Sequence, residues 1–324
     1  MIIYLLLLIL SFTLTYIIKN YYIKNAILEE VNERSSHTVP TPHGGGIAIV
    51  ITWFVGLVYL NYVNEIDATL FYALMVGVVI SVVSYFDDIY ELSPKLRLGV
   101  QLAVALGALV ALGGLNTLDF GIFTITNDIV TNTIAIVAII WYINLYNFLD
   151  GINGYAGSEA IFLSIAGLLI FGGAHFGVLA VAVLGFLYWN WNKAKIFMGD
   201  VGSTLLGYNV AIFTLYYANQ EATNLWVWII LFGVFWFDAT LTLIRRKLNG
   251  EKLSQAHKKH GYQRLNQSGW SHYKVTNYSI VVNVCIFILL YIGIQLDLIF
   301  VSFVMVLTSL YGIMKFIDKK KAFK

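Results

Sequence analysis

Residues 68–95 read ATLFYALMVGVVISVVSYFDDIYELSPK, an apolar run that closes with Asp87 and Asp88 and leads to Lys95. A helix rises 1.5 Å per residue, so about 20 mainly apolar residues cross the ~30 Å hydrocarbon core of a bilayer. The run is long enough and carries no charge before Asp87. It therefore predicts a membrane-spanning helix with acidic residues at its C-terminal end.

The rest of the chain repeats this pattern. Of its 324 residues, 59% are hydrophobic and 12% are charged, whereas soluble domains have about 45–50% and about 25%. This composition excludes a soluble enzyme. Apolar runs begin near residues 2, 45, 68, 96, 129, 157, 175, 203, 225, 277 and 296. We therefore expect an all-α, polytopic integral membrane protein with about eleven transmembrane helices, and a small hairpin over residues 118–126, where apolar residues alternate.

The basic residues predict the orientation. With eleven spans, all 20 Lys and Arg residues fall in the odd-numbered connections and at the C-terminal end, and the opposite face carries only acidic charges. Cytoplasmic loops carry the excess of Lys and Arg in membrane proteins. We expect the N-terminus outside, the C-terminus in the cytoplasm, and one domain over residues 1–324 with cytoplasmic loops at about 19–44, 86–96, 146–157, 190–203 and 245–276.

Polar residues gather at the cytoplasmic ends of these predicted helices. Asp87, Asp88 and Asp150 lie at C-terminal ends, where the helix dipole disfavours a carboxylate, so a cation should compensate them. Carboxylate oxygens suit Mg²⁺, which takes few protein ligands alongside phosphates, and Mn²⁺ is the alternative ion. Asn147 lies three residues before Asp150 and shares its helical face, which Asn153 extends. The competing interpretation is a set of solvated helix ends.

Two glycine-containing segments precede apolar runs. Residues 199–203 read GDVGS and place Asp200 at a helix start, where free N–H groups can meet phosphate oxygens. Residues 40–46 read PTPHGGG, with His43 beside three glycines that permit a close approach of backbone and ligand. For the glycines alone, a flexible joint with a close helix contact explains the pattern equally well.

The ninth connection, residues 245–276, is basic and contains His257, His260 and Arg264. Zinc is not expected, because a structural site needs about four ligands and the single cysteine, Cys285, lies in an apolar run. Imidazoles in a basic segment are suited to donate hydrogen bonds to an anionic diphosphate. For the lysines, attraction to anionic lipid headgroups is the alternative. Acids for a metal and basic groups for phosphates together indicate phosphoryl transfer.

Five segments, in this order, resemble the polyprenyl-phosphate N-acetylhexosamine-1-phosphate transferases of glycosyltransferase family 4, which include the phospho-muramoyl-pentapeptide translocase. They are residues 35–46 (SSHTVPTPHGGG), 86–88 (FDD), 147–151 (NFLDG), 197–203 (FMGDVGS) and 257–260 (HKKH). The resemblance covers nearly the whole chain. It implies an Mg²⁺-dependent enzyme of the bacterial cytoplasmic (inner) membrane, with its active site facing the cytoplasm. Such an enzyme transfers a sugar 1-phosphate from a UDP-sugar to undecaprenyl phosphate and releases UMP.

The resemblance also implies roles for single residues. The expected catalytic residues are Asp87, Asp88 and Asp200, with Asp200 as the Mg²⁺ ligand and Asp87 as the base that handles the lipid phosphate. The expected substrate-binding residues are Phe197, stacked on uracil; Asn190, at the nucleotide; Asn147, Asp150 and Asn153, lining the site; His257 and His260, at the diphosphate or sugar; and the basic residues Arg264, Lys95 and His43.

Two departures from the family pattern bear on the substrate. Asn153 stands where many members have a second Asp, and His257 and His260 are spaced where the translocase branch has three adjacent histidines. The second departure favours the branch that starts O-antigen or other surface polysaccharides on an N-acetylated hexosamine or 6-deoxyhexosamine. No nucleic-acid partner is expected, and a homodimer is left open. The competing hypothesis is an ion-coupled transporter, because Asp238 lies within an apolar run, but the chain has no internal repeat and its acids lie at one face.

Overall fold

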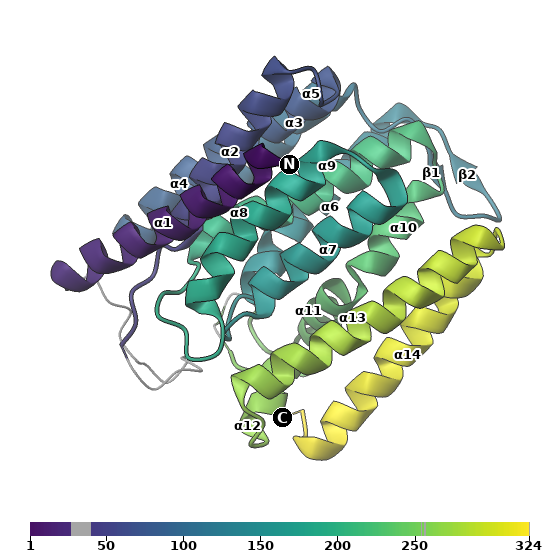
Figure 1. Ribbon diagram of the computed structural model, residues 1–324. Coiled ribbons are helices and arrows are strands. Elements are labelled where there is room, and N and C mark those ends of the chain that lie inside the picture. The colour runs from purple at the N-terminus through teal and green to yellow at the C-terminus, as the bar shows by residue number, and fades with distance from the viewer. Residues whose placement is uncertain (27–39, 254, 256, 324) are drawn as a thin grey trace.

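The computed structural model describes residues 1–26, 40–253, 255 and 257–323. They form a bundle of long helices with one short hairpin (Figure 1). The helices are α1 Ile2–Lys24, α2 Gly46–Tyr62, α3 Ala68–Met75, α4 Gly77–Tyr90, α5 Pro94–Leu112, α6 Asp128–Phe148, α7 Tyr155–Phe171, α8 Ala174–Asn190, α9 Asp200–Gln220, α10 Asn224–Leu231, α11 Gly233–Leu248, α12 Gly261–Gln267, α13 His272–Gln295 and α14 Ile299–Lys320.

The apolar runs of the sequence are helices in the structure. Each predicted start lies within five residues of the first residue of a helix. In the described part of the chain, six helices are long and apolar enough to cross a membrane, with α3 and α4 counted together. The bent pair α10 and α11 makes a seventh, and α2, α7 and α8 are apolar but shorter. The protein is therefore a mostly helical, polytopic membrane protein, while the count of eleven crossings and the orientation stay predictions.

Helix α9 forms the centre of the bundle and packs against α2, α4, α6 and α10. Its buried residues include polar side chains such as Asn209 and Thr214. A helix that is enclosed by other helices has no face toward lipid, so it tolerates polar residues that a peripheral span does not. Gly207 allows α6 to approach closely, because a Cβ atom there would lie 2.5 Å from the carbonyl oxygen of Tyr142.

A sharp bend of 73° separates α10 from α11. It falls at Phe232 and Gly233, and a glycine is a common site of helix kinks. The indole N–H of Trp236 donates to the carbonyl of Ile229, in the turn before the bend, over 2.7 Å. This bond offers the backbone a partner where the regular helical ladder is interrupted. The sequence predicts one apolar run from about residue 225, and the structure divides it into two helices at this bend.

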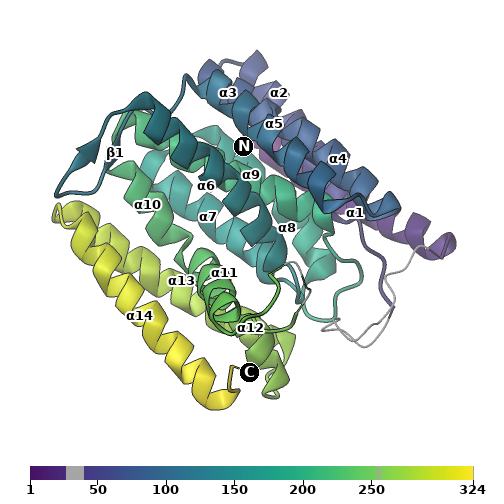
Figure 2. The same cartoon turned by 180° about the vertical axis from the view of Figure 1, so that it is seen from behind.

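The predicted hairpin is present. Strand β1, Leu118–Asp119, pairs antiparallel with β2, Thr124–Ile125, and Leu118 lies opposite Ile125. Both views place this hairpin at the end of the bundle away from α12 and the C-terminus (Figure 2). The acidic and histidine motifs lie at the α12 end, which we call the site end.

Candidate active site

A cavity of about 500 Å³ opens at the site end, between α4, α5, α6, α9, α11 and the ninth connection. Five of the residues that the sequence singled out line it: Asp87, Asn147, Asp200, His257 and His260. They come from four separate stretches of chain, so the fold assembles acidic and basic groups around one space. That space is large enough for a diphosphate and part of its substituents.

Asp87 lies in the last turn of α4 and is 9% exposed. Its Oδ1 accepts a hydrogen bond from the backbone N–H of Leu92 over 2.8 Å, and its Oδ2 lies 3.1 Å from Nη1 of Arg97. The partner needed for a carboxylate at a helix C-terminus is therefore an arginine of the next helix.

Arg97 is a site residue that the sequence analysis missed. Helix α5 begins at Pro94, with Ser93 as its N-cap, and this phase turns both Arg97 and Gln101 toward the cavity. Lys95, the predicted basic residue of this segment, is exposed and does not line the cavity. The proline marks the helix start, and residues four apart, such as Arg97 and Gln101, lie on one face of a helix. The helical period could therefore have predicted that Arg97 faces the site.

Asp200 is the first residue of α9 and is held from α6. The side-chain amide of Asn147 donates to Asp200 Oδ1 over 2.8 Å and to Ser203 Oγ over 2.9 Å. The backbone N–H of Asp200 donates to Asp88 Oδ1 over 3.3 Å. Asp88 Oδ2 is buried and, within the described residues, has no hydrogen-bond partner. A cation bound beside Asp200 would give the buried Oδ2 of Asp88 a partner. Asp88 itself does not line the cavity.

The donor set fits a magnesium ion that is held mainly by its substrate. Within the described ranges, no three His, Cys, Asp or Glu side chains come together as a metal cage. Mg²⁺ is usually bound through one or two carboxylates plus phosphate oxygens and water, and does not require such a cage. Asp200 and Asp88 supply that number of carboxylates.

His257 faces the cavity from the ninth connection. Its ring centroid lies 4.8 Å from that of His260. Burial, together with nearby His260 and Arg246, lowers the pKa of His257 to about 4, so the imidazole is neutral at pH 7. The backbone N–H of Lys259 donates to His257 Nδ1 over 3.2 Å. Since Nδ1 accepts, the ring proton is on Nε2, where it can be donated to a ligand.

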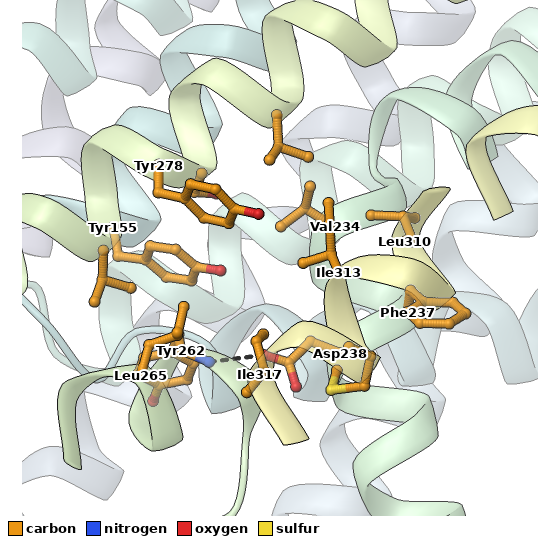
Figure 3. A pocket seen from close by; sticks show the side chains of 14 residues that line it. Tyr155, Val234, Phe237, Asp238, Tyr262, Leu265, Tyr278, Leu310, Ile313 and Ile317 are labelled. Carbon is orange, nitrogen blue, oxygen red and sulfur yellow. Dashed lines mark hydrogen bonds between the residues drawn. The ribbon is translucent and has the colours of Figure 1, made fainter. Parts of the chain in front are cut away.

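Asp238 anchors the helix that follows His260. Its Oδ1 accepts from the backbone N–H of Gly261 over 2.6 Å, and its Oδ2 accepts from that of Tyr262 over 3.2 Å. Figure 3 shows the second bond beside a small cavity of about 50 Å³ behind α12. A buried carboxylate at a helix N-terminus satisfies free N–H groups. This structural role accounts for Asp238, the residue on which the transporter hypothesis depended.

Two predicted binding residues have partners within the protein. Asn190 is buried, its Oδ1 accepts from the N–H of Gly154 over 2.9 Å, and its amide donates to the carbonyl of Ile196 over 2.9 Å. Arg264 is 2% exposed and donates to Asp318. Neither side chain lines the cavity, and the substrate contacts predicted for them stay predictions.

The two glycine-containing segments lie side by side. The N–H of Gly45 donates to the carbonyl of Phe197 over 2.9 Å, and the N–H of Phe197 donates to that of Pro42 over 2.8 Å. His43 packs edge-on against Tyr22 and lies close enough to Asp200 for their charges to interact. This pairing brings the PTPHGGG and GDVGS segments to the same end of α9. Residues 35–39, which begin the longer family segment SSHTVPTPHGGG, lie outside the described residues.

Asp150, Asn153 and Phe197 lie at the site end but do not line the cavity. All three are partly exposed. The backbone of Asn153 is fixed by α13, because its N–H meets His272 Nδ1 at 3.5 Å and its carbonyl accepts from Thr276 over 3.0 Å. Their predicted contacts with substrate stay predictions.

Comparison with known proteins identifies the family of the chain. Residues 70–218 match the model of glycosyl transferase family 4. A probable undecaprenyl-phosphate N-acetylglucosaminyl 1-phosphate transferase of Bacillus subtilis is 33% identical over 273 residues, which are 80% of this chain and 75% of that protein. A decaprenyl-phosphate N-acetylglucosaminephosphotransferase of Mycobacterium tuberculosis is 28% identical, over 75% of this chain and 70% of its own length. A phospho-N-acetylmuramoyl-pentapeptide-transferase of Halalkalibacterium halodurans is 28% identical, over 84% of this chain and 91% of its own.

The described helices form a membrane bundle with acidic and basic groups around a cavity at the site end. The chain belongs to glycosyl transferase family 4, among the polyprenyl-phosphate N-acetylhexosamine-1-phosphate transferases. The family that the sequence motifs predicted is thereby confirmed, and the protein is a transferase.

Proposed function

We propose that the protein transfers N-acetylhexosamine 1-phosphate from a UDP-sugar to undecaprenyl phosphate, releasing UMP. The observation that carries this proposal is the cavity lined by Asp87, Arg97, Asp200 and His257 at one end of an apolar bundle. A polyprenyl phosphate has its chain in the bilayer and its phosphate at the surface. A cavity with phosphate-binding groups at the end of membrane helices suits both parts.

Asp200 would hold Mg²⁺, with the free Oδ2 of Asp88 as the second protein oxygen. When bound, the ion neutralises charge that develops on the diphosphate. Asn147 fixes the Asp200 carboxylate by a 2.8 Å hydrogen bond, so it positions the ligand oxygen. Mn²⁺, which prefers the same oxygen ligands, is expected to substitute.

The reaction is a displacement at phosphorus. A phosphate oxygen of the lipid attacks the β-phosphorus of the UDP-sugar, the bond from that phosphorus to the bridging oxygen breaks, and UMP leaves with the electron pair. Asp87 takes the proton of a monoprotonated lipid phosphate. Arg97, which is partly exposed beside Asp87, can fork to the incoming phosphate.

The imidazoles of the ninth connection would contact the donor. His257 has its Nε2–H free to donate to a diphosphate oxygen, and His260 lines the cavity beside it. A donor N–H in a partly buried site stabilises an anionic oxygen more than it does in water. We also propose that the aromatic ring of Phe197 stacks on uracil, as the motif FMGDVGS implies.

The site end is proposed to face the cytoplasm, where UDP-sugars are made. All 20 Lys and Arg residues lie on that side of the predicted topology. The proposed location is the bacterial cytoplasmic membrane. The spaced His257 and His260 favour initiation of a surface glycan such as an O-antigen. The name of the Bacillus subtilis relative, an N-acetylglucosaminyl 1-phosphate transferase that is 33% identical, makes UDP-N-acetylglucosamine the first donor to test.

The test is a reconstituted reaction. Purified protein in detergent is incubated with undecaprenyl phosphate, Mg²⁺ and a panel of UDP-sugars, and UMP is measured. We expect UMP with at least one UDP-N-acetylhexosamine, only when lipid phosphate is present. Asp200→Asn should remove most of this activity, while Asp128→Asn, the same change at an exposed position in the first turn of α6, should not. Turnover that persists in excess chelator would contradict the role of the metal.

A further inference from the structure

The C-terminal segment lies beside α12 in both views of the molecule (Figure 1). We propose that Asp318, Lys321 and Phe323, which we call the C-terminal latch, position the histidines of the ninth connection for donor binding. This inference rests on the proposed function, and it adds positioning residues that lie outside the cavity. None of the three lines the cavity, so each would act through another residue.

The carboxylate of Asp318 joins two helices by three hydrogen bonds. Arg245 of α11 donates to both of its oxygens, over 3.0 Å and 3.1 Å, and Arg264 of α12 donates to Oδ1 over 2.6 Å. A two-pronged arginine–carboxylate pair fixes geometry as well as charge. Asp318 therefore sets the distance between α11 and α12.

The segment after Asp318 completes the enclosure of Arg264. The carbonyl of Lys321 accepts from Nε of Arg264 over 3.1 Å and also from Nη2. The ring of Phe323 lies 5.4 Å from the guanidinium carbons of both Arg245 and Arg264, and 5.7 Å from Nζ of Lys259. An aromatic face attracts cations at this range. Three basic side chains from the ninth connection and α11 thus converge on one aromatic ring.

Arg264 connects the latch to the histidines. Its side chain is 3% exposed, and its backbone N–H donates to the carbonyl of His260 over 2.9 Å, one helical turn away. Lys259, the third cation at Phe323, lies between the two histidines and donates its backbone N–H to His257 Nδ1. A buried guanidinium that loses its carboxylate is left uncompensated. We expect α12 to shift so that Arg264 reaches water, and His257 and His260 to move with it.

The latch should affect one substrate and leave the other alone. The histidines belong to the ninth connection, whereas Asp87 and Arg97 come from α4 and α5. Loss of the latch should therefore raise KM for the UDP-sugar by about tenfold, the size expected when a charged hydrogen bond is lost. The KM for undecaprenyl phosphate should stay unchanged.

The variants are Asp318→Asn, which removes the charge and keeps the shape, and Phe323→Leu, which removes the aromatic face. Asp297→Asn is the matched control. It makes the same change at an exposed residue at the opposite end of α13 and α14, in a left-handed conformation that Asn tolerates. Asp318→Glu restores the carboxylate and should recover part of the donor affinity.

Hydrogen exchange of residues 257–267 in detergent reports the latch without any assay of activity. We expect faster exchange there in Asp318→Asn and Phe323→Leu, and no change in Asp297→Asn. The donor KM should rise in the same two variants. In a His257→Ala background, adding Asp318→Asn should raise the donor KM by much less, because residues that act through one another are not additive.

Unchanged exchange in Asp318→Asn would overturn the proposal, and so would faster exchange with an unchanged donor KM. Full additivity with His257→Ala would also overturn it, because the latch would then act elsewhere. A wild-type protein that makes no UMP would instead refute the proposed function, and the exchange result would still decide whether the latch holds α12.

Discussion

Replacing Arg97 by Gln removes the positive charge that the cavity wall presents beside Asp87. The two side chains are 3.1 Å apart, with Asp87 8% and Arg97 44% exposed. Coulomb's law gives about 1 kcal/mol at this distance in bulk water and about 5 kcal/mol at an effective dielectric constant of about 20. Because Arg97 is nearly half exposed, water screens the pair and the lower part of the range applies, about 1–2 kcal/mol.

The assay is the initial rate of UMP release with undecaprenyl phosphate varied at saturating UDP-sugar. A lipid phosphate that approaches Arg97 as closely as Asp87 does would lose a similar attraction, about 1–2 kcal/mol, which corresponds to a fall of about 5- to 30-fold in kcat/KM for the lipid phosphate. Arg97→Lys should recover part of this loss, because it keeps the charge and loses the fork. Lys247→Gln, which removes a charge from an exposed position in the last turn of α11, should stay within about twofold.

An unchanged kcat/KM in Arg97→Gln would refute the reasoning from the ion pair. A larger loss in Lys95→Gln than in Arg97→Gln would show that the basic residue chosen from the sequence, and not the one that lines the cavity, meets the lipid phosphate.

Three further predictions concern the metal, the histidine and the topology. Asn147→Ala should raise the Mg²⁺ concentration needed for half-maximal rate by about tenfold, because the hydrogen bond that fixes Asp200 is lost; a rate that is independent of Mg²⁺ would contradict this. An anion at His257, whose pKa is about 4 in the free protein, should raise that pKa, so UDP-sugar binding should take up protons between about pH 4 and 7. Calorimetry in two buffers of different ionisation enthalpy measures this uptake, and its absence would exclude the contact. A reporter fused after Lys324 should stay in the cytoplasm and one inserted near Asn219 should be exported; the opposite result for either would mean that the span count is wrong.

The lowered pKa of His257 also makes the free energy of unfolding depend on pH. An unfolded histidine has a pKa of about 6.5, and burial lowers that of His257 to about 4 in the folded protein. Below the unfolded value, the unfolded chain binds a proton that the folded chain does not. With respect to His257, the free energy of unfolding is therefore highest above about pH 6.5, and it declines as the pH falls toward 4.

The positions of the helices could be predicted closely from the sequence. Lipid-facing helices need long apolar runs, and these runs mark helix starts to within five residues. The convergence of Asp87, Asn147, Asp200 and His257 could be predicted too, because acids and amides recur at one side of the predicted topology. Membrane helices require apolar residues along their length, so their positions are visible in the sequence.

Contacts between side chains of separate helices could not be predicted. The 73° bend involves Gly233 and the bond from Trp236, and a single glycine in an apolar run does not predict where a helix breaks. Arg264 is predicted to bind substrate because it follows two histidines, and its contact with Asp318, 54 residues further along the chain, leaves no local signal in the sequence. Long-range pairing of this kind is set by tertiary packing, which the local sequence pattern does not predict.

The most direct test of the central claim is to measure which bond of the UDP-sugar breaks. UDP-N-acetylglucosamine labelled with ³²P at either the α- or the β-phosphate is incubated with the protein, undecaprenyl phosphate and Mg²⁺, and the lipid fraction is extracted. Transfer of sugar 1-phosphate predicts that the β-label enters the lipid and that the α-label stays in the water phase as UMP. Release of both labels together as UDP would mean that the sugar is transferred without its phosphate, and would contradict the account.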